Sequence, residues 1–172
     1  MTFSTLVQVP EYRERMYRCA QLLIDAGADV NDASYKENDC ALPALFGAAG
    51  KNHDLRMTRL LLDAGANPND GESLFHSLEG RGIEIARTLL KAGATVDGNI
   101  LRHCLDQDDL EKLKLLLPHT NEVTDGVVWA IERGRSRAHV ELLIAAGAER
   151  SAYKLALQRG RRISRTCYKR SR

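Results

Sequence analysis

The sequence predicts an all-α fold, a solenoid of stacked helix-turn-helix units. The prediction rests on two blocks that alternate along the 172 residues. One is a leucine-rich block that ends in Ala-Gly-Ala or a variant of it, and the other is an apolar block that precedes most of its copies. Such self-similarity is typical of solenoids, in which each unit buries its apolar face only against the next unit.

The leucine-rich block predicts the outer helix of each unit. It reads LLIDAGADVN at 22–31, LLLDAGANPN at 60–69, LLKAGATVD at 89–97 and LLIAAGAER at 142–150, and a degenerate copy, LLLPHT, lies at 115–120. The glycine of this block is suited to the left-handed conformation that ends many helices. Thr120 replaces it in the degenerate copy, and the glycines of the other copies are Gly27, Gly65, Gly93 and Gly147.

The other block predicts the inner helix. Its copies start at residues 43, 73, 99, 125 and 151, so the period is 26 residues after a first interval of 30. Apolar residues recur in it at helical spacing, for example at Val127, Val128 and Ile131. Each copy starts with a residue suited to a helix N-terminus, and these residues are Pro43, Ser73, Asn99, Asp125 and Ser151.

With these blocks the sequence resembles the ankyrin repeat, whose units pair a TPLHxAA inner helix with a VxLLLxxGADVN outer helix. LLIDAGADVN matches closely, and PALFGAAGKNHDLRMTRLLLDAGANPN is a nearly complete unit with Phe46 in place of the histidine. SLFHSL keeps that histidine as His76, which the resemblance implies makes the structural hydrogen bonds of the turn. The resemblance covers roughly residues 11–160, and the short units are similar to those of bacterial ankyrin proteins. TPR and HEAT solenoids have longer periods and lack the Gly-Ala cap.

The resemblance implies a single ankyrin-repeat domain over residues 1–160, followed by a basic C-terminal tail, 161–172. We expect short turns where ankyrin repeats carry β-hairpin fingers. The exception is the first connection, ADVNDASYKENDCAL, which has room for a projecting loop. About five repeats are expected, at 5–27, 43–65, 73–93, 99–120 and 125–147, with a C-terminal half repeat at 151–160.

The two ends of the predicted array differ from its middle. TFSTLVQV, before Pro10, is a poor inner segment, and we expect it to act as an N-terminal cap. SAYKLALQRGR at 151–161 is a good inner helix, yet no leucine-rich block follows it. We therefore expect a chain that is cut short after residue 160, with a half repeat that frays and associates weakly with a second copy.

Composition places the chain among globular proteins. Hydrophobic residues make up 44% and charged residues 28%, which is enough apolar sequence for a core. No apolar stretch approaches the length of a membrane-spanning helix, and MTFSTLVQVP lacks the features of a secretory signal. We expect a cytoplasmic protein with reduced cysteines, or one in the host cell cytoplasm if it is a secreted effector.

Charge is distributed unevenly along the chain. Residues 159–172 hold seven basic residues and no acidic one, which leaves 18 basic and 23 acidic residues in 1–158, a net charge of −5. A body of that sign is not typical of a nucleic-acid-binding surface. Only the tail has the charge for such an association.

No motif in the sequence predicts catalysis, a metal site or a cofactor. GAAGK at 47–51 lacks the leading glycine of a phosphate loop, and Asn52 follows it where Ser or Thr is needed. Four histidines lie in different repeats without the spacing of paired metal ligands: His53, His76, His119 and His139. His103 and Cys104 are adjacent in the sequence, so they do not face one another on a helix. The prediction is a non-enzymatic protein without cofactor or metal.

By analogy with the family, we expect another protein to bind the concave face or the long first loop. Trp129, the only tryptophan, predicts either packing between neighbouring inner helices or an aromatic anchor for a partner. The polar inner-helix ends form a line across successive repeats, which indicates a binding surface or merely solvated helix ends. The candidate partner-binding residues are Tyr35, Lys36, Lys51, Arg81, Asp106, Gln107, Trp129, Glu132, Arg133, Gln158 and Arg159.

Three functional predictions follow. The first is an interaction scaffold that binds a host protein, if the chain is a bacterial effector, or a toxin, if it is an immunity protein. The second is nucleic-acid association through the basic tail. The third is a truncated product without a function of its own. A membrane partner is not expected.

Overall fold

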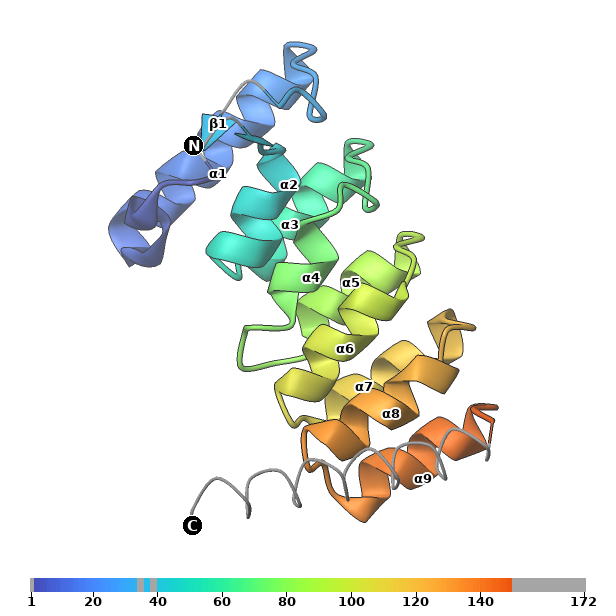
Figure 1. Ribbon diagram of the computed structural model, residues 1–172. Helices are drawn as coiled ribbons and strands as arrows, with labels where there is room; N and C mark the ends of the chain where they lie inside the picture. Colours follow the sequence, from blue (N-terminus) through green and yellow to red (C-terminus); the bar gives the residue numbers. More distant parts are fainter. Residues whose placement is uncertain (1, 34–35, 38–39, 150–172) are drawn as a thin grey trace. The chain divides into compact units, whose positions relative to one another are not determined.

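The computed structural model describes residues 2–33, 36–37 and 40–149, and the chain forms two compact units, Met1–Ala94 and Thr95–Arg172 (Figure 1). In both units the described residues are mostly helical, which confirms the predicted all-α class. A two-stranded antiparallel ribbon, β1 (Lys36–Glu37) and β2 (Cys40–Ala41), lies in the long first connection. The limits predicted for the single domain and its repeats stay a prediction.

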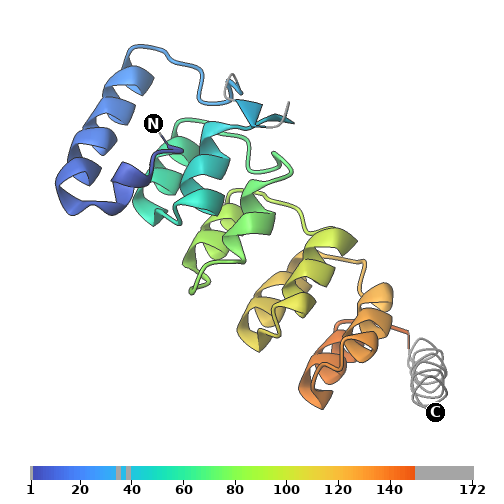
Figure 2. The ribbon, with the colours of Figure 1, turned by 60° about the vertical axis from the view of Figure 1, so that its left-hand side comes forward.

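The first unit begins with an irregular pair, a 3₁₀ turn η1 and the long helix α1, and continues with shorter helices. Inner and outer helices lie side by side, as Figure 2 shows. The elements are η1 (Thr5–Gln8), α1 (Pro10–Asp25), α2 (Ala44–Phe46), the π-helical turn η2 (Gly47–Lys51), α3 (Leu55–Asp63), α4 (Ser73–Ser77) and α5 (Glu84–Lys91).

The second unit repeats the same arrangement. Inner helix α6 packs against outer helix α7 and against the next inner helix, α8, which in turn packs against α9. Its described elements are α6 (Gly98–Asp106), α7 (Leu110–Leu116), the 3₁₀ turn η3 (Leu117–His119), α8 (Thr124–Glu132) and α9 (Arg137–Ala145).

The core of each unit is made of the leucines of the two repeated blocks. In the second unit Leu105, Leu113 and Leu143 are completely buried. Gly126 lets α8 approach them, because a Cβ at that position would lie only 3.0 Å from Leu143 Cδ2. Each fully buried leucine contributes roughly 1.5–3 kcal/mol, so stacking supplies most of the stability of these short helices.

Four of the five outer helices end as predicted. Gly27, Gly65, Gly93 and Gly147 have φ between +86° and +104°, a region that favours glycine. Thr120 does not take over that role, because its φ of −139° and ψ of 149° are extended. Instead α7 runs into the 3₁₀ turn η3, so this end needs no left-handed residue.

The N-caps predicted for three described inner helices are wrong, because these residues lie in the first turn of the helix instead: Ser73, Asn99 and Asp125. Ser73 begins α4, and its amide is capped by Asp70 Oδ1 at 2.7 Å. α6 is capped by Asp97, which accepts a hydrogen bond from the amide of Ile100 at 2.8 Å, two residues before the predicted Asn99. Asp125 lies inside α8, whose N-cap, Val123, makes no side-chain bond. Pro43, expected in the first turn, is instead the N-cap of α2, and Ser151 is outside the described residues.

Asparagines connect successive turns of the first unit where ankyrin repeats carry fingers. Asn31 Nδ2 donates to the carbonyl of Gly65 at 3.0 Å, and Asn31 Oδ1 accepts from the amide of Asn67 at 2.7 Å. Asn69 Nδ2 repeats the pattern on the carbonyl of Gly93 at 3.0 Å. These bonds let short turns hold neighbouring repeats together.

The first helix, α1, is the least buried of the described outer helices. Ala20 is its one buried residue. The exposed large hydrophobic residues of the described chain all lie in or beside this helix: Leu6, Val9, Tyr12, Leu22 and Leu23.

Candidate partner-binding surfaces

Two of the predicted partner-binding residues, Lys51 and Arg81, line one pocket of the first unit. The pocket has a volume of about 570 Å³ and lies between the turn before α3 and the loop before α5. Both turns are on the left of the unit in Figure 1, at the opposite end of the helices from the glycine caps. We call it the Lys51–Arg81 pocket. Its other lining residues are Gln8, Asn52, His53, Leu55, Ser77, Glu79, Gly80, Gly82, Glu84 and Ile85.

The pocket is shaped by an unusual turn. His53 has a φ of +48°, which is uncommon for a residue with a side chain. Its ring packs on Gly80, where an added Cβ would lie 2.9 Å from His53 Nδ1. The π-helical turn η2 comes just before it, and such turns are frequent at functional sites. GAAGK thus forms the end of an inner helix.

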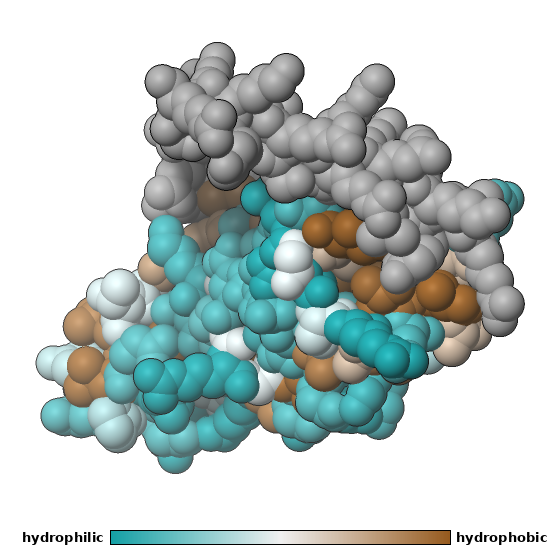
Figure 3. All heavy atoms as spheres, turned by 60° about the horizontal axis from the view of Figure 1, so that its bottom comes forward, coloured by the Kyte–Doolittle hydropathy of each residue, from teal (hydrophilic) through white to brown (hydrophobic). Residues whose placement is uncertain are grey.

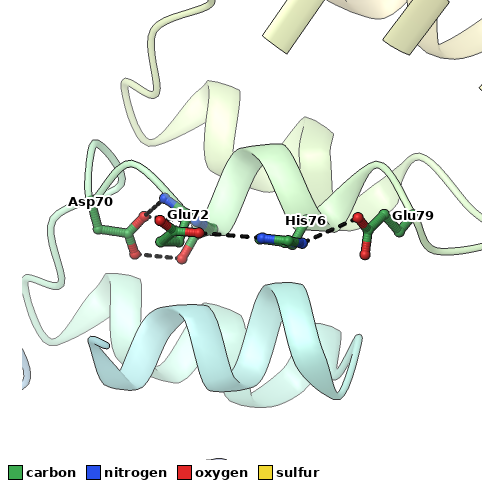
Figure 4. Close-up of polar contacts among 5 residues, drawn as sticks. Asp70, Glu72, His76 and Glu79 are labelled. Carbon is green, nitrogen blue, oxygen red and sulfur yellow. Dashed lines mark hydrogen bonds and ion pairs between the residues drawn. The ribbon is translucent and has the colours of Figure 1, made fainter. Parts of the chain in front are cut away.

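His76 does not make the turn hydrogen bonds that the resemblance implied. Its Nε2 lies 3.2 Å from Glu72 Oε2, and its Nδ1 lies 3.2 Å from Glu79 Oε1 (Figure 4). Asp70 makes the bonds of the turn, since it accepts from the amides of Glu72 and Ser73. A carboxylate can accept several hydrogen bonds at once, so Asp70 satisfies both amides.

Three other predicted residues meet in the second unit and form what we call the Trp129 cluster. Trp129 is half-buried, and its Nε1 donates a hydrogen bond to Asp106 Oδ1 at 3.0 Å. Arg133 Nε lies 3.0 Å from the same oxygen, and its Cζ is 4.6 Å from the centre of the indole ring. Arg102 Cζ lies 5.8 Å from that centre. Both arginines are within cation–π range, so they add to the hydrogen bond with Asp106 in holding the ring.

The remaining predicted residues are scattered or outside the described part. Gln107 and Glu132 are exposed at the ends of α6 and α8. Lys36 lies on β1. Tyr35, Gln158 and Arg159, with the half repeat and the basic tail, lie outside the described residues. The partner-binding role of all these residues stays a prediction.

Some residues that act across repeats were not among the predicted ones. Arg102 was not singled out, although it is one turn before Asp106 on the same helix. A groove of about 610 Å³ between α1 and α3 was also missed; in it Arg56 pairs with Glu14 and its Cζ lies 3.6 Å above the Tyr17 ring. A third pocket, of about 550 Å³, lies in the second unit between the starts of α6 and α8. No motif marks either place.

The buried His139 lies at the start of α9 among polar neighbours. His139 is 2% exposed; its Nδ1 lies 3.0 Å from Ser136 Oγ, and its Nε2 lies 3.6 Å from Asp108 Oδ1 without a hydrogen bond. Burial lowers the pKa of His139, and Arg135 lowers it further against the opposing effect of Asp108 and Asp109. Asp108 has a φ of +56° and pairs with Arg135 at 3.1 Å.

Cys104 is not suited to act as a nucleophile. It is completely buried, and burial raises the pKa of its thiol to about 12, whereas a nucleophilic cysteine needs a lowered pKa. Cys19 is exposed. Among the described residues no three His, Cys, Asp or Glu side chains gather in a way that would hold a metal ion. No described helix is both long and apolar enough to cross a membrane.

Comparison with known proteins identifies the fold. No family model matches the chain, and no curated protein matches it. Among solved structures, the chain is similar to the ankyrin repeat domain of Bcl-3, described as a unique member of the IkappaB protein family. The TM-score is 0.66, the identity is 21%, and the match covers 86% of this chain and 72% of that one. The chain has the ankyrin-repeat fold.

Proposed function

We propose that this protein is a non-enzymatic scaffold that binds another protein through the Trp129 cluster. The observation that carries the proposal is the fixed, half-buried indole ring. Asp106 and the two arginines hold it in one orientation, so little conformational entropy is lost when a partner covers it. Tryptophan and arginine are enriched among residues that dominate binding energy.

The mixed character of the surface supports a contact with another protein. Among the residues that are coloured in Figure 3, hydrophilic ones predominate, and hydrophobic ones gather in smaller patches. Such a mixed surface is typical of interfaces whose partners also exist apart. The narrower roles, a bacterial effector or a toxin-immunity protein in the cytoplasm, belong to this proposal and depend on the partner.

Capture of the partner from the native cell, followed by mass spectrometry, tests the proposal. The bait is the full chain, compared with Trp129→Ala and with Arg133→Glu. We expect a protein that the unaltered chain captures and both variants lose. Lys114→Glu is the matched control, because Lys114 is exposed on outer helix α7 and pairs only locally with Glu111. Equal capture by all four chains would contradict the proposal.

A further inference from the structure

We propose that the Lys51–Arg81 pocket of the first unit binds the C-terminal carboxylate of a partner polypeptide. This goes beyond the proposed function, because it assigns a ligand chemistry to a pocket that does not include the Trp129 cluster. The volume of about 570 Å³ is within the range of small-molecule sites, and it accommodates the last few residues of a chain.

The basic groups of the pocket provide the recognition. Arg81 is exposed, and within the part of the chain that the structure describes no hydrogen bond or ion pair engages its guanidinium. A guanidinium matches a carboxylate with two parallel hydrogen bonds. Lys51 supplies a second cation from the neighbouring repeat; its Nζ lies 5.8 Å from the centre of the Phe3 ring.

The two glutamates that line the pocket, Glu79 and Glu84, contact neighbours of their own. Glu84 Oε1 lies 3.5 Å from Arg87 Nε, and Glu79 Oε1 lies 3.2 Å from His76 Nδ1. The Arg87 guanidinium offsets the repulsion between Glu84 and a bound carboxylate. Arg81 and Lys51 supply the positive charge that attracts the ligand.

The polar wall of the pocket is held in place by the fold. Asn52 is 8% exposed, its side chain donates to the carbonyl of Thr2, and its own carbonyl accepts from Gln8 Nε2 at 2.9 Å. Ser77 Oγ donates to the carbonyl of Leu74 at 2.7 Å. Because these groups are already ordered, a ligand pays little to order them.

The charge of the unit favours a chain end over an acidic peptide. Residues 1–94 carry 10 lysines and arginines and 13 aspartates and glutamates. A run of acidic residues would be repelled by this net negative unit. A single carboxylate, followed inward by neutral residues, meets the local cations with little of that repulsion.

An NMR titration of the full, ¹⁵N-labelled chain tests the proposal. The probes are acetyl-tetraalanine with a free carboxylate, the same peptide as its C-terminal amide, and acetyl-Ala-Ala-Glu-Ala-amide. We expect the free acid to shift the backbone amides of Arg81 and Gly82. The amidated peptide, and the free acid with Arg81→Gln or Lys51→Gln, should bind at least about tenfold more weakly, a factor worth about 1.4 kcal/mol.

Arg59→Gln is the matched control, because Arg59 is exposed on α3 of the same unit and lines the groove beside α1 instead. It should leave the titration unchanged, and well-dispersed spectra of all variants exclude loss of the fold. Equal binding of the free acid and the amide, or an unaltered titration with Arg81→Gln, would overturn the proposal. Binding of the blocked glutamate peptide as tight as that of the free acid would also overturn it, in favour of a side-chain carboxylate. The capture experiment tests the Trp129 cluster and not this pocket, so its outcome does not change the meaning of the titration.

Discussion

Asp106 accepts a hydrogen bond from Trp129 through Oδ1 and pairs with Arg133 through the same oxygen, both at 3.0 Å. One carboxylate on α6 thereby orients two side chains of the next inner helix, α8. Since Trp129 is the only tryptophan, its fluorescence reports directly on this contact. The carboxylate is partly exposed, so its effect on orientation should exceed its effect on stability.

Asp106→Ala should shift the emission of Trp129 to longer wavelength, because the ring loses its partner and gains contact with water. We expect the free energy of unfolding to fall by no more than about 1 kcal/mol, the usual upper range for exposed ion pairs. Fluorescence spectra and urea unfolding measure the two effects. An unchanged spectrum would mean that packing alone holds the ring.

Thr120→Gly should lower the free energy of unfolding by roughly 0.5–1 kcal/mol. Thr120 is extended, so glycine relieves no strain there and only adds freedom to the unfolded chain. Gly93→Ala is the companion variant and should also destabilise, because its φ of +97° strains any residue with a Cβ. The denaturant midpoints of the two variants test both predictions. A higher midpoint for Thr120→Gly than for the unaltered chain would contradict the extended conformation of Thr120.

Leu113→Ala should cost roughly 2–5 kcal/mol, because this side chain is completely buried between α7 and its neighbours. In a repeat array the damage should be local. Hydrogen exchange should therefore accelerate in α6–α9 while α3–α5 keep their protection. Uniform acceleration in both units would contradict local cooperativity.

Acid should weaken the second unit through His139. Its pKa in the folded chain lies below the ordinary value of 6.5, so between the two values the unfolded chain binds more protons. Stability should therefore fall as the pH drops through 6.5 toward the folded pKa. His139→Gln, which does not titrate, should flatten this dependence in unfolding curves measured between pH 5 and 7. The same slope in both proteins would assign the effect to other groups.

The repeated blocks made the fold class, the helices and most C-caps predictable, because a glycine such as Gly65 needs only its local backbone to act. The N-caps were less predictable. Asp70 lies three residues before Ser73, and Asp97 lies two residues before Asn99. Both residues of each pair can cap a helix, and only the folded backbone decides which of them does. The contacts of His76 with Glu72 and Glu79 were not predictable either, because the sequence did not show that Asp70 makes the hydrogen bonds of the turn.

The candidate surfaces depended on contacts between repeats. Lys51 and Arg81 were predicted from their place at inner-helix ends, but nothing in the sequence shows that the left-handed His53 and Gly80 bring their turns around one pocket. Trp129 was singled out by its rarity. That Asp106 and Arg102 would hold it depended on the register of α6 against α8, which the period of 26 residues alone does not give.

Hydrogen exchange of the chain with and without its captured partner tests the central claim most directly. Binding through the Trp129 cluster predicts slower exchange at the C-terminal ends of α6 and α8, around Asp106 and Arg133. This protection should disappear with Trp129→Ala and persist with Lys114→Glu. Protection confined to the exposed face of α1, or to the basic tail, with α6 and α8 unaltered, would contradict it.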